Sequence, residues 1–218
     1  LYHLIFVVKI KNIMKVCILG DGLTSLTLAK ALVNQGIYVD IFTDNKFKNF
    51  DKFRTLGISK LNIEFFNKYI LNIEKFLWEI NRIEIFSKNL KNEKVLDFEN
   101  SKDQLFSIIK SYDLYNHLMT ELKKNKFFKL KKISIKEEFI EKSNELVINC
   151  DKDHLITKKF FNKKIYKNYD SFAYTTLIEH KKISKNNIAQ QFFTEVGPLA
   201  FLPISETKTS VVLSARNC

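Results

Sequence analysis

Apolar and polar positions alternate in blocks along the chain, and the first blocks predict a βαβ unit. Residues 15–19 form a short apolar strand, and the amphipathic pattern of a helix follows shortly after it. Gly36 is placed to end that helix, and residues 37–42 are a second apolar run. A strand, a helix and a second strand of these lengths form the repeating unit of α/β folds.

The pattern changes further along the chain. Ser59 is a suitable N-cap for a helix over residues 60–70, and apolar residues recur at helical spacing from 101 to 126. From residue 171 onward, short alternating runs and Gly/Pro turns predict an antiparallel β region. Strands are expected over 78–86, 94–98, 127–135, 145–151, 172–180, 188–194, 199–204 and 210–214.

The turn between the first strand and its helix is the most informative feature. Gly20 permits a tight turn, and Gly22 lets a phosphate approach the backbone of the helix N-terminus. Ser25 takes the place of a third glycine, and Ala29 keeps the same helix face small. We expect a dinucleotide pyrophosphate here; the alternative is a similar turn that binds no phosphate. The residues expected to bind it are Gly20, Asp21, Gly22, Leu23, Thr24 and Ser25.

The end of the second strand departs from the dinucleotide pattern. An acidic residue there commonly binds the adenosine ribose, roughly 20 residues past the glycines. This chain has Thr43 at the expected position and Asp44 next to it. Either Asp44 takes the role in a shifted register, or Thr43 makes a weaker contact. Asp44 and Asn45 could equally form a turn.

Composition and charge exclude some functions. The 218-residue chain has a net charge of +12, but only Arg54, Arg82 and Arg216 of its 36 basic residues are arginine. The lysines are scattered rather than clustered with aromatic residues, so we do not expect a nucleic-acid partner. An attraction to an anionic membrane surface fits this charge better.

Cysteine and histidine positions indicate no metal site and no disulfide framework, which fits a reducing cytoplasm. The three cysteines are far apart, and Cys17 lies within the first strand, where it serves as a small apolar residue. Residues 1–13 precede Met14 and are too short an apolar segment to span a bilayer. We interpret them as a non-native or flexible extension; a short N-terminal strand or anchor is the alternative.

Several of these motifs together resemble one enzyme family. The start GDGLTSLTLA, the segment FRTLGIS, the strand ELVINCD and above all the run FTEVGPLAFLP (193–203) resemble the flavin-dependent aromatic hydroxylases of ubiquinone biosynthesis. These enzymes belong to the p-hydroxybenzoate hydroxylase fold group. The similarity extends from Met14 to about Ser214, and the Gly-Pro-Leu-Ala-Phe-Leu-Pro run is its most specific part.

The resemblance implies a cofactor and residues that bind it. Gly20 and Gly22 would hold the pyrophosphate of FAD, and Arg54 would lie near the flavin; a solvated loop arginine is the alternative. The family's Ala-Asp-Gly at the end of a strand becomes Cys150-Asp151-Lys152, which puts the geometry of that turn in question.

The implied chemistry is hydroxylation of an aromatic ring by oxygen, with FAD as cofactor and NAD(P)H as co-substrate. The substrate would be a polyprenylated phenol of ubiquinone biosynthesis. Other enzymes of that pathway are possible partners. The expected location is the cytoplasm, with contact at the inner face of the membrane. No catalytic acid or base can be assigned. Phe172, Tyr174, Phe201 and Leu202 are candidates for an apolar wall over the ring, and plain core residues are the alternative for each.

The expected fold is α/β, a Rossmann-like FAD-binding domain with an interleaved, mostly antiparallel β substrate domain. The FAD-binding domain is expected over 14–75 and 98–165, and the substrate domain over 76–97 and 166–218. The family continues with a second flavin-binding segment, so we expect this chain to be a C-terminally truncated fragment. Two other classes remain open: a different FAD- or NAD-dependent oxidoreductase, and a non-catalytic fragment unable to hold flavin.

Overall fold

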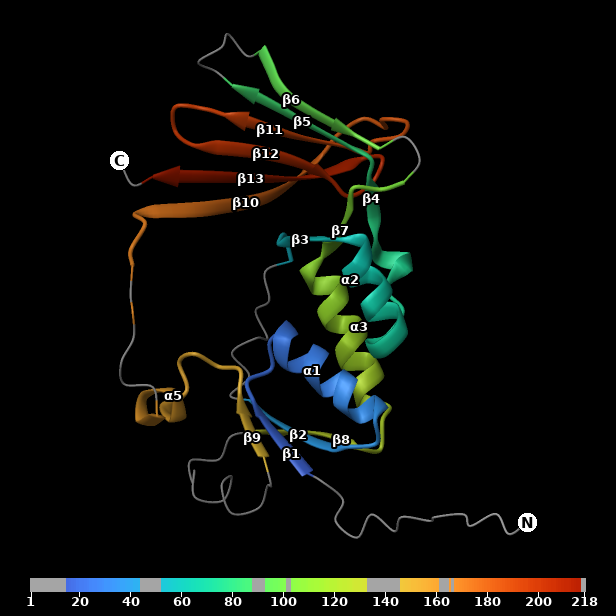
Figure 1. The fold of residues 1–218 in the computed structure, drawn as a ribbon, viewed down its shortest axis with the longest axis vertical. Coiled ribbons are helices and arrows are strands. Elements are labelled where there is room, and N and C mark those ends of the chain that lie inside the picture. The colour runs from blue at the N-terminus through green and yellow to red at the C-terminus, as the bar shows by residue number, and fades with distance from the viewer. Residues whose placement is uncertain are drawn as a thin grey trace, which may run out of the picture. The chain divides into compact units, whose positions relative to one another are not determined.

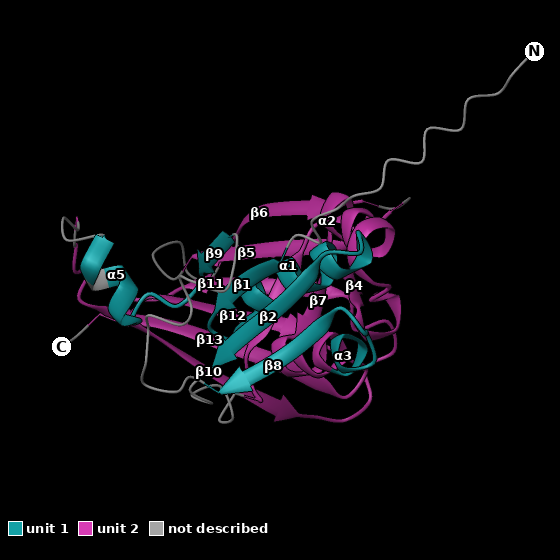
Figure 2. Cartoon of the chain, turned by 90° about the horizontal axis from the view of Figure 1, so that it is seen from below, with its two compact units in different colours: residues 1–47, 120–162 teal, residues 48–119, 163–218 magenta. Residues whose placement is uncertain are grey.

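The structure is a computed structural model, and it describes residues 15–43, 52–87, 93–100, 103–132, 146–160, 165 and 167–216. The chain divides into two compact units, each assembled from two separate stretches of sequence (Figure 2). The first unit comprises residues 1–47 and 120–162, and the second comprises 48–119 and 163–218.

The first unit is built on a parallel sheet of four strands in the order β8-β2-β1-β9 (Figure 1). Its strands are β1 (Lys15–Leu19), β2 (Tyr38–Thr43), β8 (Phe128–Lys132) and β9 (Leu146–Asn149), and its helices include α1 (Leu23–Asn34) and α5 (Leu155–Phe160). The predicted βαβ unit is therefore confirmed. Both of its strands are parallel and adjacent, as a helical crossover requires.

Strand β1 is the centre of this unit's core. Val16, Cys17, Ile18 and Leu19 are completely buried, because β1 has a neighbour on each side and helix α1 packs against it. Burial and the nearby Asp40 charge raise the pKa of the Cys17 thiol to about 11. Cys17 is thus the neutral, buried residue that the sequence predicts.

The second unit contains a small antiparallel sheet in the order β3-β7-β4. Its strands are β3 (Thr55–Ile58), β4 (Trp78–Ile80) and β7 (Phe106–Lys110). Helix α2 (Lys60–Phe65) continues into one wider turn, η2 (Phe66–Ile70), which confirms the helix predicted over 60–70. Ser59 caps it by accepting a hydrogen bond from the Asn62 backbone N–H at 3.4 Å. A short η3 (Glu74–Phe76) follows, and α3 (Ser111–Lys123) comes after β7.

A larger sheet completes the second unit, in the order β10-β13-β12-β11-β5-β6 (Figure 1). Its strands are β5 (Arg82–Ser87), β6 (Glu93–Glu99), β10 (Ser171–Glu179), β11 (Ile188–Phe193), β12 (Pro198–Pro203) and β13 (Lys208–Arg216). All neighbours are antiparallel except β11 and β5. The mostly antiparallel C-terminal region is confirmed.

One face of the larger sheet packs against the smaller sheet. Ala189 of β11 shares a buried cluster with Ile80 of β4 and Ile108 of β7. The Thr55 and Ser210 hydroxyls are 3.0 Å apart and join β3 to β13. This packing gives the second unit its core.

The structure corrects three expectations. The helix predicted over 101–126 is wrong at 106–110, where the chain forms β7 and pairs with β3 and β4. A short apolar run fits a buried strand as well as a helix, so its pattern alone does not distinguish them. The single strand predicted over 78–86 is two strands, because β4 pairs with β7 in the smaller sheet and β5 pairs with β6 and β11 in the larger one. Phe172 and Tyr174 are 55% and 61% exposed, so they are not core residues.

The predicted domains and the compact units divide the chain differently. Residues 52–75 and 98–119 were expected in the FAD-binding domain, whereas their contacts place them in the second unit. The boundaries of the expected FAD-binding domain remain a prediction.

Candidate functional site: the glycine turn of the first unit

The chain leaves β1 through a turn that requires glycine at its first position. Gly20 has a φ of +95°, and its N–H donates to the Phe42 carbonyl oxygen at 2.9 Å. A Cβ on Gly20 would lie 3.2 Å from the Cβ of Asp151, in the turn that follows β9. Both the backbone conformation and the space therefore favour glycine here, as predicted.

Gly22 is the N-cap of α1, and it has no side chain that could cap the helix. Its φ and ψ are −73° and 176°, and no side chain makes a capping hydrogen bond. The first turn contains no acidic residue, and the Leu26 N–H makes the 3.0 Å bond to the Gly22 carbonyl oxygen. The N–H groups of Leu23, Thr24 and Ser25 come before that bond and have no acceptor within the helix. This helix end is suited to an anion.

The small residues of α1 face the sheet. Ser25 and Ala29 are 1% and 0% exposed, so the position of the third glycine holds a buried, small side chain. Leu23 is half-buried and Thr24 is exposed. Helix α1 can therefore start close to β1, as the sequence predicts.

Asp21 is the residue that fits an anion least well. It lies between the two glycines and is 5% exposed, and it has interactions of its own. A carboxylate at this point of the turn places negative charge near the helix N-terminus, where it would oppose a phosphate group.

The acidic residue inside β2 is committed to ion pairs. Asp40 is 3% exposed, and its Oδ2 lies 2.9 Å from Lys15 Nζ and 2.6 Å from Lys131 Nζ. Burial opposes ionisation, but the hydrogen bonds from Lys131 and Lys15 outweigh it and lower the pKa of Asp40. The sequence pattern does not predict this ion-pair cluster, although a charged residue within an apolar run is a signal for one.

The end of β2 holds Thr43, which is 2% exposed and lies beside Lys132 of β8 in the strand register. Asp44, the other candidate for a ribose contact, lies outside the described residues. The choice between Thr43 and Asp44 remains a prediction.

The turn that follows β9 lies beside the glycine turn, at the carboxyl ends of the parallel strands β1 and β9. The Cys150 N–H donates to the Leu19 carbonyl oxygen at 3.0 Å, and the Thr157 hydroxyl donates to the Asp151 carbonyl oxygen at 3.0 Å. Outside glycine, positive φ angles among the described residues occur only at Asp170 and Lys185. Lys152 therefore needs no left-handed conformation, and the turn tolerates it in place of glycine.

Arg54 lies in the second unit, immediately before β3. It is exposed, and its carbonyl oxygen accepts a 3.0 Å hydrogen bond from the Ser111 N–H. The glycine turn belongs to the first unit, and the place of Arg54 near a cofactor remains a prediction.

The described residues also lack two other kinds of feature. No group of three or more His, Cys, Asp or Glu side chains there could bind a metal ion. Among the helices of those residues, none is both long and apolar enough to cross a bilayer.

Solved structures share this architecture, although no family model matches the chain. PqsL from Pseudomonas aeruginosa, described as a probable FAD-dependent monooxygenase, aligns with a TM-score of 0.70 at 12% identity over 94% of this chain. HpxO from Klebsiella pneumoniae, solved with FAD and uric acid, aligns with a TM-score of 0.69 at 13% identity over 94% of this chain. The chain has the fold of these flavoproteins.

The chain covers only part of each of these known proteins. The chain spans 61% of PqsL and 57% of HpxO. Among curated proteins, the mitochondrial ubiquinone biosynthesis monooxygenase COQ6 of Danio rerio is 38% identical over 50 residues, which is 23% of this chain and 10% of that protein. The likeness to the solved structures confirms the expected α/β fold with its antiparallel part.

Proposed function

We propose that this chain provides the dinucleotide-binding part of an FAD-dependent aromatic hydroxylase. The observation that carries the proposal is the glycine turn: α1 begins at Gly22 with no side-chain cap and no acidic residue in its first turn. On the fold of FAD-dependent monooxygenases, such a helix end is where a pyrophosphate binds.

The residues proposed to hold FAD belong to this turn, to the end of β2 and to the segment before β3. The N–H groups at the start of α1 would donate to the pyrophosphate, and Thr43 or Asp44 would contact the ribose. Arg54 would lie near the flavin. When bound, FAD supplies the oxygen chemistry, with NAD(P)H as the electron source. The chain's own contribution is binding and orientation.

The substrate proposed is a polyprenylated phenol of ubiquinone biosynthesis. Its support is the 50-residue similarity to COQ6 and the sequence run at 193–203. A net charge of +12 is compatible with peripheral contact at an anionic membrane surface, in a cytoplasmic protein, close to other enzymes of the pathway. These finer assignments rest on the proposed flavin binding.

A second candidate is a chain that no longer holds flavin. The observation that favours it is Asp21, whose buried carboxylate lies within the turn that should receive phosphate. A different FAD- or NAD-dependent oxidoreductase would share the turn without the hydroxylation.

Adding a charge to the turn tests the proposal. Gly22→Asp places bulk and negative charge where the pyrophosphate would bind, and Gly22 has a backbone conformation that aspartate can adopt. We expect FAD affinity, measured by quenching of flavin fluorescence, to fall at least tenfold. Asn34→Asp, which adds the same charge at the other end of α1, should leave the affinity unchanged.

Three results would separate the candidates. Equal FAD affinity in Gly22→Asp and the unsubstituted chain would contradict the proposed site. No measurable FAD binding in the unsubstituted chain would favour the non-binding candidate. FAD binding with NAD(P)H oxidation but no hydroxylated phenol would favour another oxidoreductase.

A further inference from the structure

A cavity of about 330 Å³ lies in the second unit, where β4 meets the loop that precedes β11. It is lined by Leu77, Trp78, Glu79, Asn81, Lys185 and Asn187. It shares no residue with the glycine turn of the first unit. Its volume is within the range of cavities that bind small molecules.

Hydrogen bonds hold the two sides of this cavity together. The Trp78 indole N–H donates to the Asn186 carbonyl oxygen at 2.6 Å, and the Asn81 N–H donates to the Asn187 carbonyl oxygen at 3.0 Å. The Asn186 amide donates in turn to the Ser205 carbonyl oxygen at 2.8 Å. The indole is therefore a fixed apolar wall, and the loop opposite it is anchored at several points.

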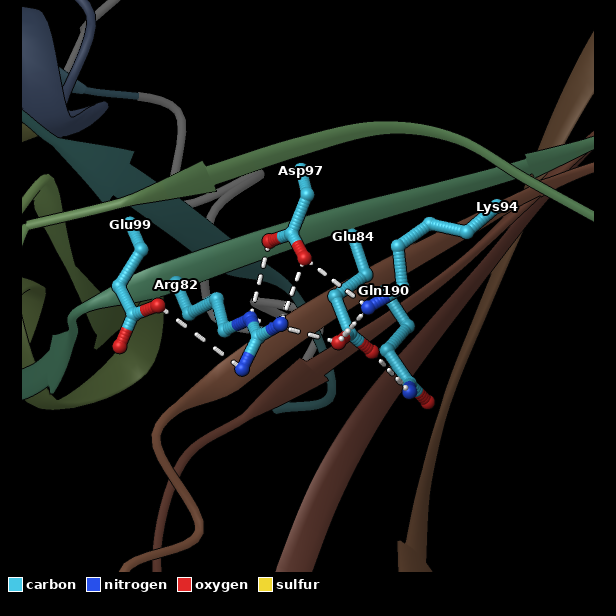
Figure 3. A network of polar contacts seen from close by, with 6 residues as sticks. All are labelled: Arg82, Glu84, Lys94, Asp97, Glu99 and Gln190. Carbon is cyan, nitrogen blue, oxygen red and sulfur yellow. Dashed lines mark hydrogen bonds and ion pairs between the residues drawn. The ribbon is translucent and has the colours of Figure 1, made fainter.

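The charged residues of the adjoining strands are paired with one another (Figure 3). Arg82 at the start of β5 donates to both carboxylate oxygens of Asp97, at 2.9 and 2.5 Å. Glu84 accepts hydrogen bonds from Lys94 at 2.7 Å and from Gln190 at 2.9 Å. These hydrogen bonds lower the pKa of both carboxyl groups, so both stay ionised. The charges of this network are already neutralised within the sheet.

The two charged residues that line the cavity are not paired in this way. Among the described residues, neither the Glu79 side chain nor the Lys185 side chain makes a hydrogen bond or an ion pair. Lys185 also has a φ of +57°, a conformation that costs free energy outside glycine and recurs at functional sites. A carboxylate and an ammonium group at one cavity, each without a partner, suit a ligand that carries both charges.

Two amide side chains add hydrogen-bonding capacity at the same cavity. The Asn81 Oδ1 atom is buried and has no hydrogen-bond partner in the described part of the chain, which costs free energy. The Asn187 side chain is half-buried and makes no hydrogen bond within that part either. The terminal torsion of asparagine is broad, so either amide can turn toward a polar group in the cavity.

We propose that this cavity binds an α-amino acid with an apolar side chain. The Lys185 ammonium pairs with the ligand carboxylate, and the Glu79 carboxylate pairs with the ligand ammonium. The apolar side chain of the ligand lies against the Trp78 indole. A simple anion or cation would leave one of the two protein charges unpaired, whereas a zwitterion neutralises both. This site is independent of the proposed flavin binding.

Tryptophan fluorescence tests the proposal directly, because Trp78 is the single tryptophan of the chain. We expect L-phenylalanine, titrated into the 218-residue chain without FAD, to give a saturable change in this fluorescence. Glu79→Gln and Lys185→Met should each raise the dissociation constant at least about fivefold, because each removes a charge-assisted hydrogen bond. Glu93→Gln and Lys181→Met are the matched controls. They remove the same charges at exposed residues outside the cavity and should leave the constant unchanged.

Ligands that keep only one of the two charges test how the amino acid is oriented. Phenylpropanoate has the carboxylate without the ammonium group, and phenylethylamine has the ammonium group without the carboxylate. Lys185→Met should weaken phenylpropanoate and leave phenylethylamine unchanged, and Glu79→Gln should do the reverse. A variant that merely distorts the cavity would weaken both ligands alike.

Four outcomes would overturn the proposal. L-phenylalanine could produce no saturable change at millimolar concentration, or the control variants could weaken it as much as the cavity variants do. The two variants could also fail to discriminate between phenylpropanoate and phenylethylamine. Finally, an indole that acrylamide cannot quench in the unliganded chain would show that another segment fills the cavity. None of these outcomes bears on FAD affinity, which Gly22→Asp tests separately.

Discussion

The two larger sheets of this protein are stabilised in different ways. In the four-stranded parallel sheet, β1 has neighbours on both sides and is completely buried from Val16 to Leu19. In the six-stranded sheet, one face packs on the smaller sheet, and β10 is mostly exposed along its length. The first sheet depends on side chains that fill a core. The second sheet depends more on the pairing of its backbone strands and on close contact between a turn and a neighbouring strand, as at Gly197 and Ser214.

The difference bears on where each sheet is vulnerable. Loss of volume in β1 leaves a cavity that its neighbours cannot fill. In the antiparallel sheet, exposed side chains contribute little, whereas a change that separates two strands breaks several hydrogen bonds at once. Substitutions that remove the same side-chain volume should therefore lower the free energy of unfolding by very different amounts in the two sheets.

The largest effect is expected at the hairpin of the antiparallel sheet. Gly197 has a φ of +145°, and a Cβ there would lie 1.8 Å from the Ser214 carbonyl oxygen. Gly197→Ala must push the hairpin away from β13 and also strain the backbone, so we expect a loss of roughly 2–6 kcal/mol in the free energy of unfolding. Urea denaturation followed by circular dichroism measures it.

Gly36→Ala is the control for this variant. Gly36 also has a positive φ, +77°, but nothing lies within 4 Å of its Cβ position. Only the backbone cost of about 1–2 kcal/mol applies there. Equal losses for the two variants would show that the close approach to Ser214 has no role.

Truncation in the core of the parallel sheet is the next largest effect. Ile18 is completely buried between Ile41 of β2 and Ile148 of β9 in the register. Ile18→Ala should cost about 2–5 kcal/mol, because it leaves a cavity. Leu96→Ala on the exposed edge strand should change stability by less than about 0.5 kcal/mol. Comparable losses in the two sheets would contradict the distinction drawn between them.

A smaller, pH-dependent effect is expected at Asp40. Its pKa is lowered, so its ion pairs with Lys15 and Lys131 stabilise the fold above the ordinary aspartate value of about 3.9, and this stability is lost as the pH falls through the lowered pKa. Because both lysines are partly exposed, Asp40→Asn should cost only about 1–2 kcal/mol at pH 7. Unfolding measured at pH 7 and at pH 2–3 should show this cost shrinking at low pH. A cost that does not change with pH would contradict the assigned ion pairs.

The sequence predicts the structure correctly where a local pattern is compatible with only one conformation. Gly20 and Gly22 between an apolar strand and a small-faced helix are placed as predicted, and Ser59 caps its helix. The prediction failed at Phe106–Lys110, where an apolar run at helical spacing became β7 because two strands pair with it. Asp40 illustrates a further limit. Its ion pair with Lys131 joins two residues that are 91 positions apart, so no local pattern predicts it.

The sequence by itself determined the βαβ unit, its glycine turn and the antiparallel character of the region after residue 171. Each of these follows from local periodicity and from residues whose backbone preferences are strong. Only the tertiary structure decided that Phe172 and Tyr174 lie exposed on a strand, that Arg82 of β5 pairs with Asp97 of β6 and that Gly197 approaches Ser214. These features depend on which strands become neighbours, because exposure and close contact belong to pairs of segments that are distant in the sequence.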